Sequence, residues 1–289
     1  MNNYMLELLQ PLRLTEVVDI GANPIDGEPP YQDMLQDSAC RVTGFEPQAE
    51  ALKQLQESKG SYERYLPYAI GDGKEHTLHI CRASGMTSLL EPDESTLKLF
   101  EVLLPLAEVI EKVSLKTKRL DDVDEITTLD FLKIDIQGSE LSVFQHGKRL
   151  LEKAVCIQTE VSFVPLYKNQ PTLGDIDIEL RQQGFIPHTA AAIKNWPIAP
   201  CIVNNNPYQP LNQLLEADLV YVRDFSKPEK MDDEQLKHLA LIAHYCYGSI
   251  DLTMRCIMLL SERQVLASSA VNDYTNWLIK EAQAAAEQA

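Results

Sequence analysis

The sequence predicts an α/β protein, with a mostly parallel, doubly wound sheet and a helical extension at the C-terminal end. Three observations support this prediction. Short apolar runs alternate with helical patterns in the first part of the chain, which is the order that a parallel sheet requires. The first apolar runs end in an acidic residue or lead directly to one. From residue 231 onward, the pattern is helical throughout.

The first part of the predicted sheet is a β-α-β-α-β unit. A short amphipathic helix over 4–13 precedes it and is stopped by Pro11. The unit itself consists of an apolar strand within 16–23, a helix at 31–37, a strand at 41–47, a helix at 48–58 and a strand at 62–71. In the second helix, Ala51, Leu52 and Leu55 fall on one face.

Two inserts interrupt the alternation, over 73–118 and over 194–213. Within the first, residues 76–82 alternate with a period of two, which predicts an antiparallel strand, and 113–118 has the pattern of a second inserted strand. Residues 93–111 have a helical pattern, with a proline that would kink or break the helix. The second insert is rich in Asn and Pro and is predicted to be a surface loop.

The rest of the sheet is predicted from strands that again alternate with helices. The strands are 129–136, 154–161, 185–189 and 217–224, and the helices between them are 139–145 and 174–183. Further helices are predicted at 234–246, 251–262 and 270–287. We therefore expect a sheet domain over 1–230 and a helical extension over 231–289, which would serve as a cap or as a homo-oligomer contact.

The composition argues against several classes of protein. The 289 residues carry a net charge of −17 with no Lys/Arg-rich run, so phosphate backbones and anionic membrane surfaces would repel the chain. The cysteines form no C-x-x-C pair, which argues against a zinc or thioredoxin-like site. The N-terminus lacks the pattern of a signal peptide, and no apolar run has membrane-spanning length. We expect a cytoplasmic protein with reduced thiols, no nucleic-acid partner and no membrane span.

A glycine and an acid at the predicted strand ends indicate a ligand that contains adenosine. Gly21 follows the first strand and lets a ligand approach the backbone closely. Glu46 ends the second strand, where a carboxylate accepts the hydroxyl hydrogens of a ribose. Two cofactor types share this signature: the nicotinamide dinucleotides and S-adenosylmethionine.

The loop after the first strand favours S-adenosylmethionine. Dinucleotide binders seat a pyrophosphate on G-x-G-x-x-G, whereas this loop reads G-A-N-P-I-D-G, with Asn23 in place of the second glycine and an amide lost at Pro24. The acids at Asp19, Asp26 and Glu28 would repel a pyrophosphate, but they suit a ligand with an ammonium and a sulfonium. No G-K-[ST] motif is present for a nucleoside triphosphate.

Three motifs resemble the FkbM family of S-adenosylmethionine-dependent methyltransferases. They are V-V-D-I-G-A-N, G-F-E-P and L-K-I-D-I-Q-G-S-E-L-S-V-F-Q-H-G, and the resemblance covers about residues 16–224. The last motif is the specific one, since the first two occur in many class I methyltransferases. The resemblance implies a Rossmann-like, seven-stranded sheet and O-methylation, commonly of hydroxyls on sugars or secondary metabolites.

The resemblance also implies where the cofactor lies. Asp19, Gly21 and Asn23 would line its methionine end, Glu46 would hold the ribose, and the loop 69–72 would flank the adenine. The full expected set is Asp19, Gly21, Ala22, Asn23, Glu46, Pro47, Ala69, Ile70 and Asp135. Two positions depart from the family pattern: the usual D-x-G-A-N-x-G is lengthened to D-I-G-A-N-P-I-D-G, and the usual acid two residues after Asp135 is Gln137.

An alcohol is a poor nucleophile until it loses its proton, so O-methylation calls for a general base. Asp135, at the end of the fourth sheet strand, is the first candidate, and Glu160, at the end of the fifth, is the second. His188 is the third, because imidazole titrates near neutrality. Each has a structural alternative as a hydrogen-bond or salt-bridge partner. Asp135 and Glu160 could also bind a divalent cation together, although the expectation is a site without metal.

The expected acceptor is a small molecule or a glycan. Ser88, His188 and Trp196 are the candidate contacts to it, because they lie in or beside the inserts, and an aromatic face suits a sugar ring. Two other functions stay open. One is a non-catalytic binding or assembly protein on a degenerate methyltransferase sheet. The other is an NAD-dependent sugar oxidoreductase, which would need the glycine-rich turn and a Y-x-x-x-K pair that the chain lacks.

Overall fold

The computed structural model describes residues 4–23 and 27–288. They belong to two compact units. The sheet unit comprises residues 16–27 and 42–224, and the helical unit comprises residues 1–15, 28–41 and 225–289. The helical unit thus takes in two early segments as well as the C-terminal helices. Pro24 and Asp26, two of the residues expected to disfavour a pyrophosphate, lie outside the described residues.

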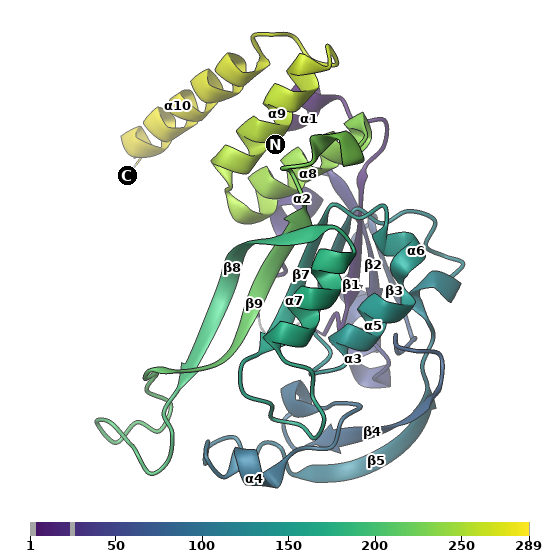
Figure 1. The fold of residues 1–289 in the computed structure, drawn as a ribbon, viewed down its shortest axis with the longest axis vertical. Coiled ribbons are helices and arrows are strands. Elements are labelled where there is room, and N and C mark those ends of the chain that lie inside the picture. Colours follow the sequence, from purple (N-terminus) through teal and green to yellow (C-terminus); the bar gives the residue numbers. More distant parts are fainter. Residues whose placement is uncertain (1–3, 24–26, 289) are drawn as a thin grey trace. The chain divides into compact units, whose positions relative to one another are not determined.

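The sheet unit is built around a seven-stranded sheet with the order β3-β2-β1-β6-β7-β9-β8 (Figure 1). The strands are β1 (Thr15–Ile20), β2 (Cys40–Phe45), β3 (Glu63–Leu66), β6 (Phe131–Ile134), β7 (Cys156–Ser162), β8 (Phe185–Trp196) and β9 (Gln213–Arg223). β6 pairs in parallel with β1 and β7, and β2 with β3, whereas β9 is antiparallel to both of its neighbours. The predicted fold class, a mostly parallel α/β sheet followed by C-terminal helices, is confirmed.

Helices pack on the sheet through the apolar residues that define their inner faces. The helices of this unit are α3 (Ala49–Ser58), α4 (Glu94–Leu97), α5 (Glu140–His146), α6 (Lys148–Leu151) and α7 (Leu173–Gln182). Phe144 of α5 and Leu180 of α7 are fully buried in one cluster with Leu132 of β6 and Ile157 of β7. A large core therefore lies between α5, α7 and the middle of the sheet.

The register brings the ends of successive strands to one edge of the sheet. Asp19 of β1 is opposite Lys133 of β6, which is opposite Gln158 of β7. The Asp135 amide, just beyond β6, donates to the carbonyl of Ile20 at 3.0 Å. Side chains that follow these strands are thus gathered at the carboxyl edge, where open α/β sheets bind their ligands.

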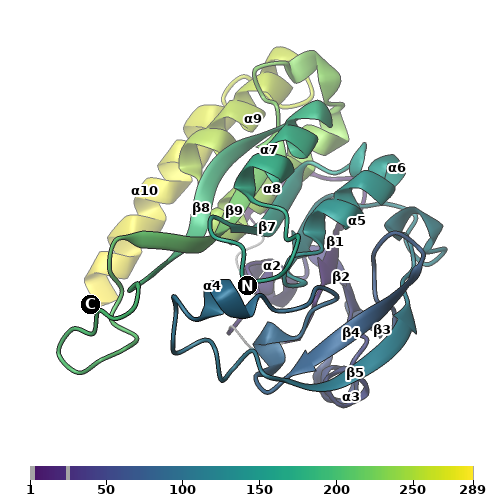
Figure 2. The same cartoon turned by 60° about the horizontal axis from the view of Figure 1, so that its bottom comes forward.

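The first insert contains the predicted antiparallel pair, but not the predicted helix. β4 (Glu75–Cys81) pairs with β5 (Val109–Lys116), as the alternation of apolar residues indicates (Figure 2). The helix predicted over 93–111 is wrong beyond α4. Turns follow α4 because Phe100 and Leu103 turn into a small cluster that also contains Tyr167, which we call the insert cluster.

The last two strands are longer than predicted. The strand predicted at 185–189 extends to Trp196, and its partner β9 begins at Gln213, so the surface loop predicted over 194–213 is confined to residues 197–212. Arg223 anchors the start of this hairpin, since its guanidinium donates to backbone carbonyls of Leu151 and Ala154 and lies 3.9 Å from the ring centroid of Phe185.

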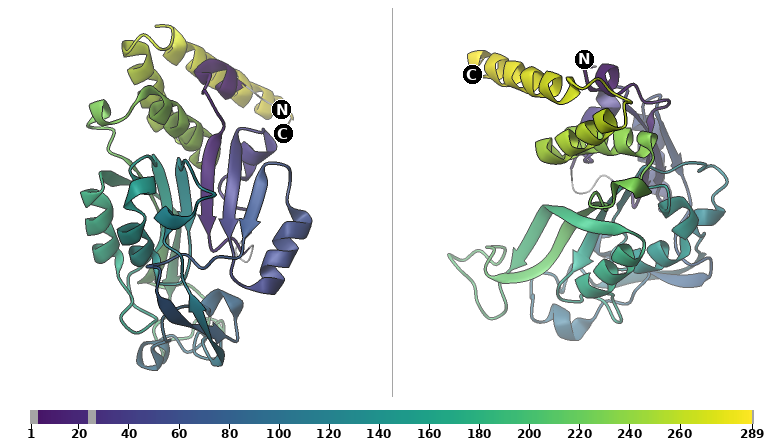
Figure 3. Two further views of the ribbon diagram at one scale, coloured as in Figure 1. Left: turned by 90° about the vertical axis from the view of Figure 1, so that its right-hand side faces the viewer. Right: turned by 45° about the horizontal axis from the view of Figure 1, so that its top comes forward.

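The helical unit is assembled from α1 (Tyr4–Leu9), α2 (Gln32–Gln36), α8 (Asp233–Tyr247), α9 (Ile250–Glu262) and α10 (Ala270–Gln288) (Figure 3). Asp232 caps α8 through the Gln235 amide, and Gly248 ends the helix in the left-handed region. Tyr4 stacks on Trp277 at 4.7 Å between ring centroids, which joins α1 to α10. Within the described part of the chain, none of the helices has the length and apolar character that crossing a membrane requires.

Candidate active site

The first acid of the candidate site is held by a lysine from the neighbouring strand. Asp19 is 3% exposed, and its Oδ1 lies 3.3 Å from Nζ of Lys133. The same ammonium lies 3.3 Å from the carbonyl oxygen of Gly21. Burial alone would lower the pKa of Lys133, but the charges of Asp19 and Asp135 outweigh it and raise that pKa. The lysine is therefore charged and neutralises much of the carboxylate at this strand end.

Gly21 is required by the fold itself. Its backbone has a φ of +80°, and a Cβ at this position would lie 1.9 Å from the carbonyl oxygen of Asp135. The missing side chain, which was expected to leave room for a ligand, thus leaves room for the backbone at the end of β6. Ala22 is buried and its amide donates to the Phe45 carbonyl, and Asn23 follows half-buried. The backbone from Gly21 to Asn23 therefore closes the edge between β1 and β2.

Glu46 is a buried carboxylate, and one of its two oxygens accepts a hydrogen bond. The side chain is 2% exposed, and its Oε1 accepts a hydrogen bond from the amide of Gln48 at 2.7 Å. Burial raises the pKa of Glu46, although this hydrogen bond opposes the shift. No other hydrogen bond from the described residues reaches the carboxylate, so Oε2 can accept the hydroxyls of a ligand. The next residue, Pro47, is exposed beside it.

The expected adenine loop is fixed by its own backbone and by Asp72. The carbonyl of Ala69 accepts from the Lys118 amide at 2.8 Å, and Ile70 is buried in the same cluster as Leu132. Asp72 accepts from His76 Nε2 at 2.7 Å and from the Lys74 amide at 2.9 Å. Burial would raise the pKa of Asp72, but these hydrogen bonds outweigh it and hold that pKa well below its usual range. These hydrogen bonds hold the backbone of the loop in place.

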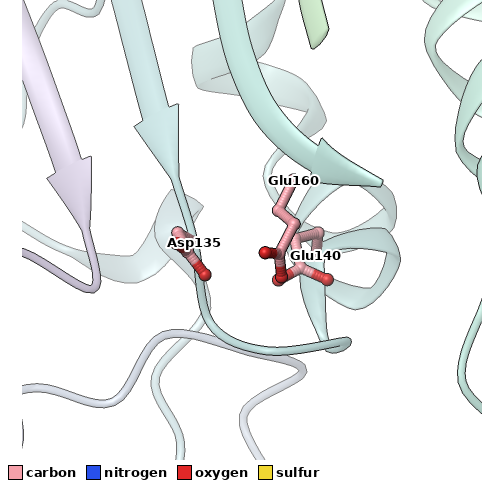
Figure 4. A group of neighbouring side chains, drawn as sticks. All are labelled: Asp135, Glu140 and Glu160. Carbon is pink, nitrogen blue, oxygen red and sulfur yellow. The ribbon is translucent and has the colours of Figure 1, made fainter. Parts of the chain in front are cut away.

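Asp135 and Glu160 come together at the ends of two neighbouring strands (Figure 4). Asp135 directly follows β6, and Glu160 lies near the end of β7 with 5% exposure. Gln137 joins them, because its Nε2 donates to Asp135 Oδ1 at 2.8 Å and to Glu160 Oε2 at 3.1 Å. Among the described residues, Gln137 alone hydrogen-bonds to the Asp135 side chain. Asp135 Oδ2 is left for another partner.

The surroundings of Glu160 disfavour its charge. Burial raises the pKa of Glu160 well above its usual value, and the charges of Asp135 and Glu216 add to the effect. Lys194 opposes it, with Nζ at 3.5 Å from Glu160 Oε1 and 2.7 Å from Glu216 Oε1. Glu160 therefore keeps its proton to a higher pH than an ordinary carboxyl group, and its anion is a correspondingly stronger base.

A third carboxyl group, Glu140, closes the turn after β6. Its Oε1 accepts from the amides of Ile136 at 2.9 Å and Gly138 at 3.1 Å, so it supports the start of α5, as expected for an acid there. Burial nevertheless raises the pKa of Glu140 to about 7. Oxygens of Asp135, Glu140 and Glu160 lie within 4.8 Å of one another, a grouping that a divalent cation can use.

The hairpin β8–β9 supplies charged residues that the sequence analysis did not select. Asp218 is opposite Glu160 in the register of β7 and β9, and Glu216 is opposite Ser162, so all lie on one face. Lys194 of β8 lies between the two glutamates. Acids at alternate positions of an otherwise apolar strand are a signal for this arrangement, because residues two apart share a face.

The three candidate acceptor contacts lie in different parts of the sheet unit. Ser88 is 1% exposed, and its hydroxyl donates to the carbonyl of Gln137 at 2.7 Å, so it braces the turn after β6. Trp196 ends β8 half-buried, packs against the insert cluster and lies edge-on to Tyr208. His188 lies near the beginning of β8, because the strand extends seven residues further than predicted, and the next residue, Thr189, is opposite Val220 of β9, which pairs with Gln158 of β7.

The family model for the methyltransferase FkbM domain matches residues 19–187, more than half of the chain. The chain belongs to the FkbM methyltransferase family. The match begins at Asp19 and includes every candidate site residue up to Glu160, whereas it ends near the start of β8. Trp196, His188 and the charged residues of the hairpin therefore lie outside the matched part. Among curated protein sequences, none matches this chain.

Solved methyltransferase structures are remotely similar to this FkbM chain. Magnesium protoporphyrin IX methyltransferase from Synechocystis PCC 6803, solved with bound S-adenosylmethionine, has 10% identity and a TM-score of 0.39 over 73% of this chain and 71% of its own. Precorrin-6y C5,15-methyltransferase from Geobacter metallireducens GS-15 has 10% identity and a TM-score of 0.36 over 75% and 84%. A putative methyltransferase from Thermoplasma acidophilum has 9% identity and a TM-score of 0.36 over 73% and 68%.

The cofactor of this FkbM methyltransferase is S-adenosylmethionine. At the carboxyl edge of the sheet, Glu46 has the chemistry that this cofactor requires. This buried carboxylate has an oxygen that no described residue hydrogen-bonds, at the strand end where an adenosine ribose is held. Asp19 fits the cofactor less simply, because its carboxylate is already paired with Lys133. The ammonium of the cofactor would have to share Asp19 with that lysine.

Proposed function

We propose that this FkbM methyltransferase methylates a hydroxyl group of a small-molecule or glycan acceptor. The observation that carries the proposal is the pair Asp135 and Glu160, which lies at the ends of β6 and β7 and is joined by one amide. A hydroxyl needs a base as it attacks a methyl group, whereas a thiolate or a neutral amine has no comparable need.

Asp135 is the proposed general base. Its Oδ1 is fixed by Gln137, and its Oδ2 is free of hydrogen bonds from the described residues, so Oδ2 can take the acceptor's proton. Bound S-adenosylmethionine supplies the electrophilic methyl group. Holding the acceptor oxygen in line with that group accounts for much of the expected acceleration, since positioning removes the entropy of a bimolecular encounter.

Glu160 supports the base as the second acid of the pair. Because burial raises its pKa, Glu160 carries a proton at pH values where an ordinary carboxyl group is ionised. A protonated Glu160 adds no negative charge beside Asp135, the proposed base.

The proposed cofactor contacts surround this pair on the β1 and β2 side. Glu46 would accept the ribose hydroxyls, the backbone of Gly21 to Asn23 with Pro47 would flank the ligand, and Ala69 and Ile70 would present backbone to the adenine. On the other side, Trp196 offers a half-buried aromatic face next to the insert cluster. Such a face suits the apolar side of a sugar ring, so Trp196 is the proposed acceptor contact.

The proposal is tested by an acceptor screen with methyl-labelled S-adenosylmethionine. The panel contains sugars, polyols and phenols, with matched amines and thiols as competing acceptor classes, and the readouts are labelled product and S-adenosylhomocysteine. Transfer to hydroxyl acceptors alone is the expected result. Preferred transfer to amines or thiols would overturn the hydroxyl assignment. Cofactor binding without transfer to any class would favour the non-catalytic binding or assembly function instead.

A further inference from the structure

Gln137 occupies an unusual backbone position between the two carboxylates. It has a φ of +57°, in the left-handed region that side-chain-bearing residues rarely adopt, and Gly138 follows with a φ of +103°. A residue with a side chain remains in this region only where its surroundings hold it there. Its carbonyl oxygen accepts the hydroxyl of Ser88 at 2.7 Å, which is one such contact.

The amide of Gln137 has all of its groups engaged in one orientation. Its oxygen, Oε1, lies 3.1 Å from the hydroxyl of Tyr167, and it shares the one hydrogen of that hydroxyl with the carbonyl oxygen of Met86, also at 3.1 Å. Tyr167 is 2% exposed and belongs to the insert cluster, so this donor is itself fixed. With Oε1 turned to Tyr167, the two hydrogens on Nε2 necessarily face Asp135 and Glu160.

We propose that Gln137 is a positioning residue for the base pair: its amide holds Asp135 and Glu160 in one arrangement and points Asp135 Oδ2 at the acceptor. The inference rests on the proposed function and adds a specific role for this chain's own residue. An amide donates to each carboxylate without adding charge, so it relieves the repulsion between two acids. It also fixes which oxygen of Asp135 is used for structure and which is left for the proton.

A glutamate in place of Gln137 would not relieve the repulsion between the two acids as the amide does. It has the same shape, but when ionised it would add another negative charge beside the pair and would offer no hydrogens to it. The tyrosine hydroxyl could still donate to it. Gln137→Glu therefore changes only the charge and the hydrogen-bond donors at the centre of the site, which makes it a sharp test of the role of the amide.

The test uses Gln137→Glu and Gln137→Gly, with Gln145→Glu as the matched control. Glycine adopts positive φ without strain, so Gln137→Gly removes the amide group while the turn can keep its backbone conformation. Gln145 is exposed on α5, so Gln145→Glu makes the same chemical change away from the pair. The readouts are kcat and KM over pH, thermal unfolding, and the carboxyl titration of Glu160 followed by NMR with ¹³C-labelled glutamate.

We expect Gln137→Gly to lower kcat by about 100-fold with little change in KM for the cofactor, as a displaced base does. In Gln137→Glu, the acid limb of the pH profile and the Glu160 titration should both move to higher pH by about one unit. Gln145→Glu should match the wild type. Unchanged pH profiles and Glu160 titrations in folded Gln137 variants would overturn the inference.

The carboxyl titration separates this inference from the proposed function. If the wild-type protein transferred no methyl group to hydroxyls, the proposed function would fail, whatever the Gln137 variants did. If the wild type were active and Asp135→Asn inactive, with the Gln137 variants titrating and turning over like the wild type, the positioning role alone would fail.

Discussion

Lys133 Nζ lies 3.3 Å from Asp19 Oδ1, across the parallel register of β6 and β1. The lysine brings a positive charge to the acidic sheet edge, as Lys194 does beside Glu160. It offsets a carboxylate that is 3% exposed, and its charge opposes the rise that burial causes in the pKa of the nearby Glu46. This one ammonium therefore supports both the stability of the edge and the ionised state of the proposed ribose acceptor.

Lys133→Met should destabilise the protein strongly. Removing the ammonium leaves the Asp19 carboxylate buried without its cation, and breaking such a pair typically costs about 3–5 kcal/mol. Urea unfolding at neutral pH measures the loss. Lys59→Met, at an exposed lysine, should stay within about 0.5 kcal/mol of the wild type. A loss no larger than that of the control would show that the pair is unimportant.

Glu46→Gln should weaken cofactor binding. The amide keeps the shape and one acceptor oxygen, but it loses the charge that strengthens hydrogen bonds to the ribose, a difference of about tenfold in affinity. Calorimetric titration with S-adenosylhomocysteine gives the dissociation constants. The exposed Glu50→Gln on α3 is the matched control and should bind like the wild type. Equal affinities in all three proteins would remove Glu46 from the cofactor site.

Glu140 should make the protein less stable as the pH rises. Its pKa in the folded protein is about 7, against an ordinary value of 4.5, so the folded state binds the proton more tightly than the unfolded chain. Its stabilising contribution is present in full below about pH 4.5 and is lost as the pH rises through about 7, by about 3 kcal/mol.

Glu140→Gln isolates this contribution, because glutamine keeps an oxygen for the amides of Ile136 and Gly138 but does not titrate. Urea unfolding across the pH range should show the variant gaining stability relative to the wild type as the pH rises. A difference between the two proteins that is constant with pH would contradict the assignment.

Methyl transfer should continue after treatment with EDTA. The carboxyl groups that could share a divalent cation are already engaged: Glu140 accepts two backbone amides, and the amide of Gln137 joins Asp135 to Glu160. The ammonium of Lys194, 3.5 Å from Glu160 Oε1, also supplies positive charge that a cation would otherwise bring. Initial rates with EDTA, and after added magnesium or manganese, decide the matter. Loss of activity with EDTA and its recovery with one metal would establish a cation site at these residues.

The sheet could be predicted from the sequence because its strands are short apolar runs between helices. The strand over 129–136 and the acid at its end illustrate this, as does the parallel order that follows from β-α-β connections. The pattern failed over 93–111, where residues at helical spacing instead fold into turns on the insert cluster. Tertiary contacts with Leu166 and Tyr167, distant in the chain, decide that conformation.

The site could be predicted only in part for a similar reason. Asp135 and Glu160 follow from the rule that ligands bind at the carboxyl ends of parallel strands. Their link through Gln137 depends on a left-handed turn and on Tyr167, and neither is visible in a local pattern. Lys194 reaches Glu160 only because β8 is longer than its apolar run suggests.

The most direct test of the account is methyl transfer to a hydroxyl acceptor by Asp135→Asn, measured beside its affinity for S-adenosylhomocysteine. Asparagine keeps the shape of Asp135 but cannot accept the proton, so we expect the rate to fall by at least about 100-fold. Affinity for S-adenosylhomocysteine should be retained, since Glu46 and the backbone of Gly21 to Asn23 are untouched. Transfer by Asp135→Asn at the wild-type rate would contradict the account, because the base would then lie elsewhere.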